Sequence, residues 1–538
     1  DVDIKGKITD TDLEKIENKM KELIKTWGSF EKKVLTPNEA LEMFAGNTYK
    51  EELINGIVEK GEEITIYTSG DFTDLCRGGH IENMKNVQDG SWKLERIAGA
   101  YWRGDEKNKM LTRVYGLAFE TKDELEKYIW QLEEAKKRDH RKIGKEMGLF
   151  VFSDLVGAGL PLWTPKGTIM RELLNDYIWN LRKSRGYKKV TIPHITKKEL
   201  YETSGHWAKY ADDLFKIHTR EDHTYAMKPM NCPHHTQIFD SMPHSYKAMP
   251  ERYCETTMVY RDEQSGELSG LSRVLSITQD DSHVFCRENQ IEEEVMAIWE
   301  IIEIFYKTFG FELQIRFSRH DPKTPEKYLG GSEVWAKAEN SLENLMKQKG
   351  VKYIDGIGEA AFYGPKIDFI SHDSIGRVLQ VATIQLDFNM PKNFGLTCTN
   401  EKNEKEQVVM IHCAVMGSIE RFMSTLIEHL AGVFPLWLSP TQVTILPISE
   451  HQKEYASSIY ESLKESDIRV ELDDSNESLG KRIRNAKMSK VPYVIVIGDK
   501  ERDSKVITVE GRTEKLEGIT IEDFLKRLQK EIKERTLN

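Results

Sequence analysis

The sequence predicts a multidomain protein that combines α/β and α+β folds, and three observations support this prediction. The chain has 538 residues, too many for a single hydrophobic core, so about three domains are expected. Residues 254–283 read as two strands joined by a Gly/Ser-rich turn, a pattern that indicates an antiparallel hairpin. From residue 439 onward strand-like and helical stretches alternate, which is typical of an α/β domain with a mostly parallel sheet. We therefore expect domains at residues 1–135, 136–438 and 439–538.

The composition excludes some classes of protein. With 39% hydrophobic and 31% charged residues, the chain has the make-up of an ordinary globular protein. Its net charge of −11 argues against indiscriminate nucleic-acid binding, although an acidic protein can carry a local basic face. Six cysteines without a paired framework indicate a reducing cytoplasm, and without a membrane-spanning apolar run no membrane contact is expected. The chain begins at Asp1 rather than at methionine, so it need not be a complete gene product.

The first domain is expected to be an α/β segment followed by a linker helix. Asp10–Asp12 is a suitable cap for the amphipathic helix that follows it, and Glu63–Tyr67 reads as a strand. The Gly-rich stretch Thr68–His80 is expected to be a turn. A single helix that starts with a capping box and has a solvated basic face is expected over Thr121–Met147.

The central domain opens at Gly148, where the sequence turns apolar and aromatic. Helical periodicity predicts helices over Thr168–Gly186, Arg287–Gly310, Ser332–Lys349 and Ser418–Leu430. Strands are expected over Tyr187–Pro193, Tyr225–Met230, Cys254–Tyr260, Ser272–Thr278, Glu359–Ile367, Leu379–Phe388 and Gln407–His412.

Two arginines and a carboxylate lie near the tip of the hairpin, at Arg261, Glu263 and Arg273. A guanidinium pairs with a phosphate through two hydrogen bonds, and a carboxylate can hold an amine, so these residues suit a planar anion. The residues alone favour a simpler interpretation, a solvated hairpin with charged ends.

Cys232, His283 and His412 are candidate metal ligands by residue type. They are far apart in the sequence and show none of the close spacing of a zinc finger. On the residues alone, a buried cysteine and two hydrogen-bonded histidines are therefore the favoured interpretation.

Taken together, these stretches resemble the threonyl-tRNA synthetases of class II. Arg261-x-Glu263, a loop, Arg273 and then QDDSH are similar to motif 2 of that class, and Glu420-Arg421 in GSIER is similar to motif 3. MNCP, QDDSH and MIHCAVMGSIERF match the three positions that bind zinc in the family. Pro193 resembles motif 1, which forms the dimer interface of class II enzymes. The resemblance covers essentially the whole chain. It implies a class II catalytic domain with an antiparallel sheet, a partial editing domain and a C-terminal α/β anticodon-binding domain.

The resemblance implies the activity of a threonine–tRNA ligase. ATP and L-threonine would form threonyl-adenylate, and the 3′ end of tRNA(Thr) would then take the aminoacyl group. Such an enzyme is expected in the cytoplasm as a homodimer, with one Zn²⁺ per subunit and with Mg²⁺ accompanying ATP. Zinc can bind the hydroxyl of threonine, so valine, which has no hydroxyl, should not be activated. Serine lacks only a methyl group and should be activated by mistake.

The resemblance also assigns roles residue by residue. The catalytic residues would be Arg261, Arg273 and Arg421. ATP would be bound by Arg261, Glu263, Arg421, Gln380 and Thr383, and the amino acid by Met230, Gln279, Asp281, Tyr363, Lys366 and Gln385. Zn²⁺ would be bound by Cys232, His283 and His412.

Two stretches depart from the pattern of the family. DLCRGGH and Gly99–Gly116 resemble the second half of the editing domain, in which Cys76 and His80 would act with an H-x3-H motif further upstream. No such motif precedes Cys76, so we expect an editing remnant and inefficient clearance of seryl-tRNA. Without the resemblance, a Cys-x3-His pair is weak evidence for a metal site. Beside a zinc ligand, His234 stands where the family usually has glycine.

The last domain contains one strongly basic helix, expected near residues 479–490. It contains Lys481, Arg482, Arg484, Lys487 and Lys490, as contact with nucleic acid requires. The domain resembles the anticodon-binding domain shared by several class II enzymes, which implies tRNA as a partner. Glu510 lies near the position at which relatives often have an anticodon-reading arginine, and Arg512 follows two residues later.

Two other functions stay open on the sequence. A catalytically inactive synthetase relative could act as an RNA-binding or regulatory protein, although the motif 2 and motif 3 residues are intact. A zinc hydrolase could use Cys232, His283 and His412, but the chain lacks the H-E-x-x-H arrangement that places a base beside two ligands. ATP–pyrophosphate exchange with threonine excludes the first alternative, and chelator-sensitive hydrolysis without ATP would indicate the second.

Overall fold

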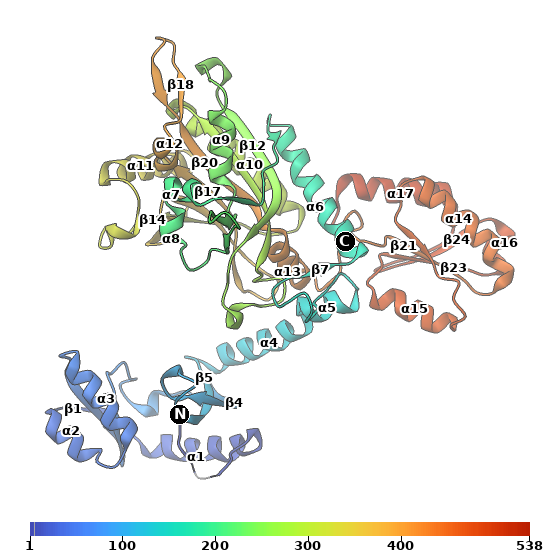
Figure 1. The fold of residues 1–538 in the computed structure, drawn as a ribbon. Helices are drawn as coiled ribbons and strands as arrows, with labels where there is room; N and C mark the ends of the chain where they lie inside the picture. The colour runs from blue at the N-terminus through green and yellow to red at the C-terminus, as the bar shows by residue number, and fades with distance from the viewer. Residues whose placement is uncertain (5, 538) are drawn as a thin grey trace. The chain divides into compact units, whose positions relative to one another are not determined.

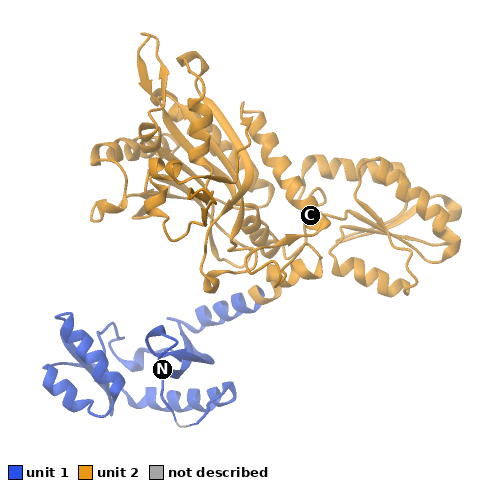
Figure 2. Cartoon of the chain, viewed as in Figure 1, with its two compact units in different colours: residues 1–134 blue, residues 135–538 orange. Residues whose placement is uncertain are grey.

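The computed structural model describes residues 1–4 and 6–537 and separates into two compact units, Asp1–Glu134 and Ala135–Asn538 (Figure 2). The second unit contains two large hydrophobic cores, one drawn from residues 143–438 and one from residues 436–528. The domain limits expected at residues 135 and 438 stay predictions. Within the part of the chain that the structure describes, no helix is long and apolar enough to cross a membrane.

The first unit is a mixed α and β structure (Figure 1). Its antiparallel sheet has the order β1–β2–β3, and β4 pairs with β5 in a separate antiparallel hairpin. The helices are α1 (Leu13–Thr26), α2 (Pro37–Met43) and α3 (Thr48–Glu59), and the strands are β1 (Glu31–Leu35), β2 (Ile64–Ser69), β3 (Phe72–Leu75), β4 (Trp92–Tyr101) and β5 (Met110–Ala118). The prediction of a single turn over Thr68–His80 was wrong, because β3 lies inside it and pairs with β2.

The predicted linker helix is two helices, α4 (Lys122–Arg138) and α5 (His140–Glu146). The capping box at the start of α4 is present, since Thr121 N donates to Glu124 Oε2 at 3.0 Å and Glu124 N donates to Thr121 Oγ1 at 3.2 Å. The helical periodicity did not reveal the break at Asp139. Its carboxylate accepts a hydrogen bond from Arg141 N at 2.8 Å and so caps a new helix.

An eight-stranded sheet forms the centre of the second unit, in the order β15–β14–β16–β17–β20–β13–β12–β8. The six strands from β14 to β12 are antiparallel to their neighbours, and the two outermost strands pair in parallel. The strands are β8 (Lys188–Lys189), β12 (Glu251–Tyr260), β13 (Ser276–Cys286), β14 (Gln314–Arg319), β15 (Tyr353–Ile357), β16 (Lys366–His372), β17 (Val378–Asp387) and β20 (Val409–Ser418). The antiparallel sheet that the family resemblance implied for this domain is confirmed.

Four long helices pack with this sheet in the larger hydrophobic core: α6 (Pro165–Lys183), α10 (Ile291–Thr308), α11 (Ser332–Lys349) and α13 (Ile419–His429). Shorter helices are α7 (Lys198–Ser204), α8 (His206–Lys209), α9 (Cys232–Asp240) and α12 (Asn389–Asn393). Short strands are β6 (Phe150–Val151), β7 (Leu162–Trp163), β9 (Ile195–Lys197), β10 (Lys216–His218), β11 (Thr224–Met227), β18 (Thr397–Thr399) and β19 (Lys405–Gln407).

Several predicted strands of this unit differ from the observed ones, and the strand predicted over Gln407–His412 is β20, which continues to Ser418. The second arm of the hairpin begins at Ser276 instead of Ser272 and continues to Cys286, so QDDSH lies inside a strand and does not end it. Only Lys188–Lys189 pairs within the predicted strand Tyr187–Pro193, and most of Glu359–Ile367 is a loop that enters β16 at Lys366. Where these strands begin and end depends on their pairing with strands distant in the sequence, and local strand propensity does not predict that pairing.

The end of the second unit is a five-stranded sheet in the order β22–β21–β23–β24–β25. Its strands are β21 (Val443–Pro447), β22 (Val470–Leu472), β23 (Tyr493–Ile497), β24 (Ile507–Gly511) and β25 (Lys515–Ile519), and its helices are α14 (Lys453–Glu465), α15 (Leu479–Met488), α16 (Asp499–Ser504) and α17 (Ile521–Glu534). The prediction of a mostly parallel sheet was wrong. Only β22–β21 and β21–β23 are parallel, whereas β23–β24 and β24–β25 are antiparallel. For the last pair no other arrangement is open, because only a short turn joins β24 to β25.

A buried ion pair joins α6 to the central sheet. Arg182 and Asp280 are 2% and 0% exposed, and Arg182 Nη2 donates to Asp280 Oδ1 at 2.9 Å. Removing one partner of such a pair leaves a buried charge without its counter-charge. We expect Arg182→Met to lower the free energy of unfolding by about 3–5 kcal/mol, measured by urea denaturation followed by tryptophan fluorescence.

Arg185→Met is the matched control, because Arg185 pairs with Glu300 at 2.5 Å in solvent. This control variant should lower the free energy of unfolding by less than about 1 kcal/mol. Equal losses in the two variants would contradict the importance of the buried pair.

Candidate functional site

The site is built on four neighbouring strands, β16, β17, β20 and β13. Lys366 lies opposite Gln385, Gln385 opposite His412, and His412 opposite His283. Side chains of directly opposed residues point to the same face of a sheet, so these four polar side chains form one row. The next residues along three of these strands, Ile367, Ile384 and Ile411, point to the other face and into the larger core.

Cys232 joins this row from the first turn of α9. The candidate ligand atoms of Cys232, His283 and His412 all lie within 4.8 Å of one another, and the three residues are at least 95% buried. One sulfur and two imidazole nitrogens are a donor set that suits Zn²⁺, and three protein ligands leave one position open, as in catalytic zinc sites. The residues present therefore fit a zinc ion.

Hydrogen bonds in a second layer orient the two imidazoles. His412 Nε2 lies 3.1 Å from Asp387 Oδ2 and donates to it, which leaves Nδ1 for a metal. His283 Nδ1 lies 2.8 Å from His235 Nδ1, which leaves Nε2. Burial lowers the pKa of His283 well below its ordinary value, so the ring is the neutral imidazole that a metal requires. Burial likewise raises the pKa of the Cys232 thiol well above its ordinary value.

A cavity of about 270 Å³ lies against this metal-ligating cluster. Its lining includes all six residues assigned by resemblance to the amino acid: Met230, Gln279, Asp281, Tyr363, Lys366 and Gln385. Asp281 Oδ2 accepts a hydrogen bond from Asn231 Nδ2 at 3.0 Å, and burial raises the pKa of Asp281 to about 6. Gly364 has no room for a side chain, because a Cβ there would lie 2.0 Å from Leu386 O.

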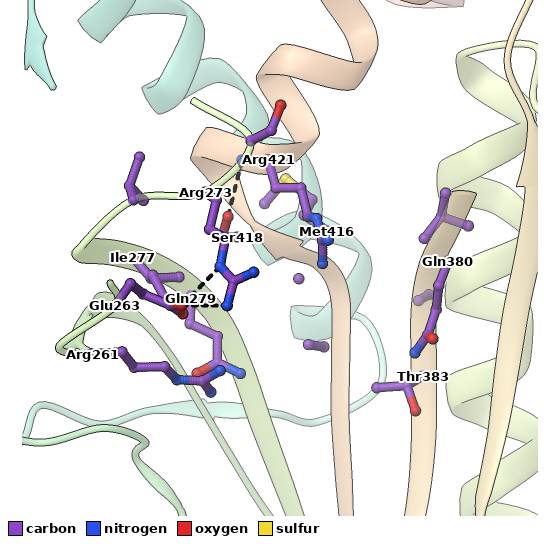
Figure 3. A pocket seen from close by; sticks show the side chains of 16 residues that line it. Arg261, Glu263, Arg273, Ile277, Gln279, Gln380, Thr383, Met416, Ser418 and Arg421 are labelled. Atoms are coloured by element: carbon purple, nitrogen blue, oxygen red, sulfur yellow. Dashed lines mark hydrogen bonds and ion pairs between the residues drawn. The ribbon is translucent and has the colours of Figure 1, made fainter. Parts of the chain in front are cut away.

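A second cavity, of about 430 Å³, adjoins the first and is lined by all the residues assigned to ATP. Figure 3 shows Arg261, Glu263 and Arg273 on one side of it and Gln380 and Thr383, from β17, on the other. Gln279 and Thr383 line both cavities. Gln279 Oε1 and Thr383 Oγ1 are buried and have no hydrogen-bond partner among the described residues, as expected where a ligand supplies the partner.

The arginines of this second cavity differ in their partners. Arg273 contacts Glu263 Oε2 at 2.5 Å and Glu267 Oε2 at 2.8 Å (Figure 3 shows the first pair). Arg421 lies in the first turn of α13, whose N-cap Ser418 accepts a hydrogen bond from Arg421 N at 2.9 Å. Glu420, which precedes it, is buried and accepts two hydrogen bonds from Thr278, so it anchors the helix to β13.

Cys76 and His80 lie in the first unit, with Sγ 3.4 Å from Nε2. The His80 ring stacks on Phe30 with the ring centroids 4.2 Å apart. No candidate metal group among the described residues includes either of them.

The predicted basic face of α15 needs a correction. Arg482 is 5% exposed and donates to Asp473 O at 2.8 Å, so it points into the domain. Arg512 is also tied to the backbone, since its guanidinium donates to Phe434 O and Lys490 O, and burial lowers its pKa to about 10. Both arginines are tied to backbone carbonyls within this domain.

Sequence reasoning missed several residues of the site. Tyr210 lines the smaller cavity, and Asn231, His235 and Asp387 bond to Asp281, His283 and His412. Asp387 could have been found, because it follows Gln385 by two residues in a strand and therefore lies on the same face. His234 lies inside α9 and its backbone N donates to Asn231 O at 3.0 Å, so the departure from glycine leaves a regular helix start.

The chain matches three family models. Residues 215–430 match the tRNA synthetase class II core domain (G, H, P, S and T), residues 442–531 match the anticodon binding domain, and residues 64–115 match the threonyl and alanyl tRNA synthetase second additional domain. A threonine–tRNA ligase of Flavobacterium johnsoniae is 46% identical over 540 residues, which cover 99% of this chain and 83% of that protein. A threonine–tRNA ligase of Porphyromonas gingivalis is 47% identical over 531 residues, which cover 98% and 81%.

Solved structures show the same likeness. The crystal structure of the RNA binding domain of threonyl-tRNA synthetase from Cryptosporidium parvum has a TM-score of 0.70 and 34% identity, over 73% of this chain and 98% of that one. A putative threonyl-tRNA synthetase from Aeropyrum pernix has a TM-score of 0.64 and 28% identity, over 74% and 97%. The predicted class II catalytic fold with an anticodon-binding domain is confirmed.

The second-layer bond of His412 gives a test. Asp387→Asn keeps an oxygen for the backbone N–H groups of Asn389 and Met390, which bond Asp387 Oδ1 at 2.7 and 3.0 Å, but turns an amide nitrogen toward His412. The amide nitrogen can only donate a hydrogen bond, so His412 Nε2 must accept it. The proton of the ring then lies on Nδ1, and the Nδ1 lone pair that a metal would use is lost. We expect about a 10–100-fold loss of zinc affinity, measured by competition with a chromophoric chelator.

Asp373→Asn is the matched control, because Asp373 also accepts two backbone hydrogen bonds but touches no candidate ligand. Equal zinc affinities in Asp387→Asn and the unmodified chain would show that Asp387 does not orient the ligand.

Proposed function

This chain belongs to the threonine–tRNA ligase family, and we propose that it selects threonine through a zinc ion bound by Cys232, His283 and His412. The family identity gives the reaction, in which an amino acid is joined to tRNA at the expense of ATP. The observation that carries the proposal is the convergence of one thiol and two imidazoles, from three distant stretches, beside a cavity of about 270 Å³.

The larger cavity is the proposed site of ATP with its Mg²⁺. Arg261 and Arg273 bind the α-phosphate, Arg421 binds the γ-phosphate, and Glu263 holds the adenine amino group. The reaction needs no side-chain nucleophile, because the threonine carboxylate attacks the α-phosphate. The chain contributes orientation and positive charge, which stabilise the developing charge on phosphate without reorganisation. Gln380 and Thr383 complete this cavity from the opposite side.

The smaller cavity is the proposed threonine site, lined by Met230, Gln279, Asp281, Tyr363, Lys366 and Gln385. A zinc ion held by Cys232, His283 and His412 would supply a Lewis acid for the amino and hydroxyl groups of threonine. Asp281 accepts the hydroxyl proton. Valine has no hydroxyl and leaves these polar groups unpaired, whereas serine differs by one methyl group, worth about 1–3 kcal/mol.

tRNA(Thr) and a second copy of the chain are the proposed macromolecular partners. The match of residues 442–531 to an anticodon binding domain supports the first. Apolar side chains exposed between residues 151 and 162 support the second, since a patch of this kind marks an interaction surface, and Leu155 there is 99% exposed. All six cysteines are free, as expected in a reducing compartment, which supports a cytoplasmic location.

Metal removal and the choice of amino acid test the zinc proposal together. We expect the unmodified chain to catalyse ATP–pyrophosphate exchange with threonine, less with serine and none with valine. Cys232→Ser should lower zinc content and reduce exchange by at least about 100-fold, because loss of a ligand exceeds the effect of a second-layer change. Zinc content is measured by atomic absorption.

Cys398→Ser is the control, since Cys398 is also buried but lies outside both cavities. It should keep its zinc and its exchange activity. Activation of valine, or exchange that survives complete removal of zinc, would refute selection by the metal.

Editing gives a separate expectation. Cys76 and His80 have no third candidate ligand near them among the described residues, so we propose that residues 1–538 hydrolyse seryl-tRNA slowly. A complete set of general acid–base groups typically accelerates a reaction by about 10²–10⁴-fold. Because the set is incomplete here, we expect a deacylation rate within about tenfold of the uncatalysed rate. The measurement is loss of radiolabelled serine from tRNA, with Cys76→Ala as the control. Rapid hydrolysis that Cys76→Ala abolishes would contradict the proposal.

A further inference from the structure

His140, the first residue of α5, is a buried histidine outside both cavities that bonds two elements of the ATP site. It is 3% exposed. Its Nδ1 lies 2.6 Å from Glu428 Oε1, and its backbone N donates to the same oxygen at 3.2 Å. On the other side of the ring, Nε2 accepts a hydrogen bond from Leu271 N at 3.0 Å.

These contacts fix the state of the ring. A backbone N–H can only donate, so His140 Nε2 is unprotonated and Nδ1 carries the hydrogen that it donates to Glu428. Asp139, His140 and Glu428 could hold a metal ion by distance alone. Both nitrogens of His140 are already engaged, so no lone pair is left for a metal, and the group reads as a structural bridge.

The bridge joins the two segments that present arginines to the larger cavity. Glu428 lies two helical turns after Arg421 on α13. Leu271 belongs to the loop between β12 and β13 and precedes Arg273 by two residues. Leu271 is fully buried, and Ser272 Oγ bonds Ser424 Oγ of α13 at 3.1 Å, so the loop is fastened to the helix at two adjacent points.

The backbone of the loop is shaped for this contact. Gly270 has a φ of +50°, and a Cβ at this residue would lie 2.3 Å from His140 Nε2 and 2.8 Å from Arg141 Cγ. The loop can approach α5 this closely because residue 270 lacks a side chain.

The carboxylate at the other end of the bridge is held in its charged form. Arg377 Nη2 donates to Glu428 Oε2 at 2.5 Å. Burial by itself would raise the pKa of Glu428, but the hydrogen bonds from His140 and Arg377 outweigh it and keep the pKa below its ordinary value. A hydrogen bond to an ionised carboxylate is about twice as strong as one between neutral groups, so the His140 bond is a firm one.

We propose that His140 is a positioning residue for nucleotide binding: it fixes the loop of residues 261–275 against α13, so that Arg273 and Arg421 converge on the phosphates of ATP. The inference rests on the proposed ATP site. His140 touches no ligand and acts through Leu271 and Glu428. Its effect should fall mainly on the nucleotide, because the threonine cavity is built on β16, β17, β20 and β13 and takes from the loop only Arg261, ten residues before Leu271.

The test is threonine-dependent ATP–pyrophosphate exchange by the full chain loaded with zinc. We expect His140→Ala to raise the KM for ATP about tenfold, the loss expected from one buried hydrogen bond to a charged group, while the KM for threonine stays within about twofold. His140→Gln keeps a donor and an acceptor and should restore most of the affinity for ATP. A merely structural role would lower the fraction of active sites, counted by adenylate burst, and leave both KM values unchanged.

His320→Ala is a matched control, because His320 bonds Glu339 with the same geometry, through backbone N at 3.0 Å and Nδ1 at 2.7 Å, but contacts no ATP-site loop. It should leave the KM for ATP unchanged. Glu428→Gln, which weakens the bridge without removing a side chain, should raise the KM for ATP about threefold and decides the question if His140→Ala does not fold.

Calorimetric titration with ATP separates this inference from the proposed function. Absence of exchange in the unmodified chain would contradict the proposed function alone. An unchanged Kd for ATP in His140→Ala, or an equal rise in the KM values for ATP and threonine, would overturn the role of His140.

Discussion

Both cavities depend on the register in which β13 pairs with β20. His283 lies opposite His412 only in this register, and a shift of either strand by one residue would turn the imidazole of that strand toward the apolar core. The other face of the sheet holds the register, because Val284 and Ile411 pair across the same strands and are 1% and 0% exposed. At one end of this ladder the pairing is interrupted between Gln279 and Asp281. There Asp280 turns away from the cavities and accepts hydrogen bonds from Val415 N and Met416 N, both at 3.1 Å, which pins the two strands together.

The same burial that builds the metal-ligating cluster also sets its electrostatics. Without a cation, a buried thiolate or imidazolium would be costly, and burial moves the pKa of Cys232 upward and that of His283 downward so that both stay neutral. The neutral imidazole is already the form that binds metal, whereas the thiol must release a proton when the metal arrives. His235 and Asp387 hold the rings so that their remaining lone pairs are available. The cluster is thus stable as a set of neutral groups and becomes a strong ligand set only for a cation.

The sequence predicted what depends on local chemistry and missed what depends on pairing across long distances. The capping box at Thr121 and the helix Ser332–Lys349 follow from spacing alone, and both are observed at the predicted residues. The convergence of Cys232, His283 and His412 could not follow from spacing, because it depends on the pairing of β13 with β20, and only the family resemblance indicated it. The limits of β13 shifted for the same reason. Residue type also misled at Arg482, which was expected to contact nucleic acid and instead donates a hydrogen bond to a backbone carbonyl.

Burial distinguishes the arginines that maintain the fold from those that can exchange partners. Arg182 is almost fully buried with Asp280, and breaking that pair would leave a charge in the core. The side chain of Arg273 is 48% exposed in its pairs with Glu263 and Glu267, and an ion pair that is open to solvent contributes little to the free energy of folding. A phosphate can therefore replace those carboxylates at Arg273 at small cost, provided that the loop itself keeps its place. Buried contacts such as that of Leu271 with His140 meet this condition, because they fix the backbone while the guanidinium stays free to change partners.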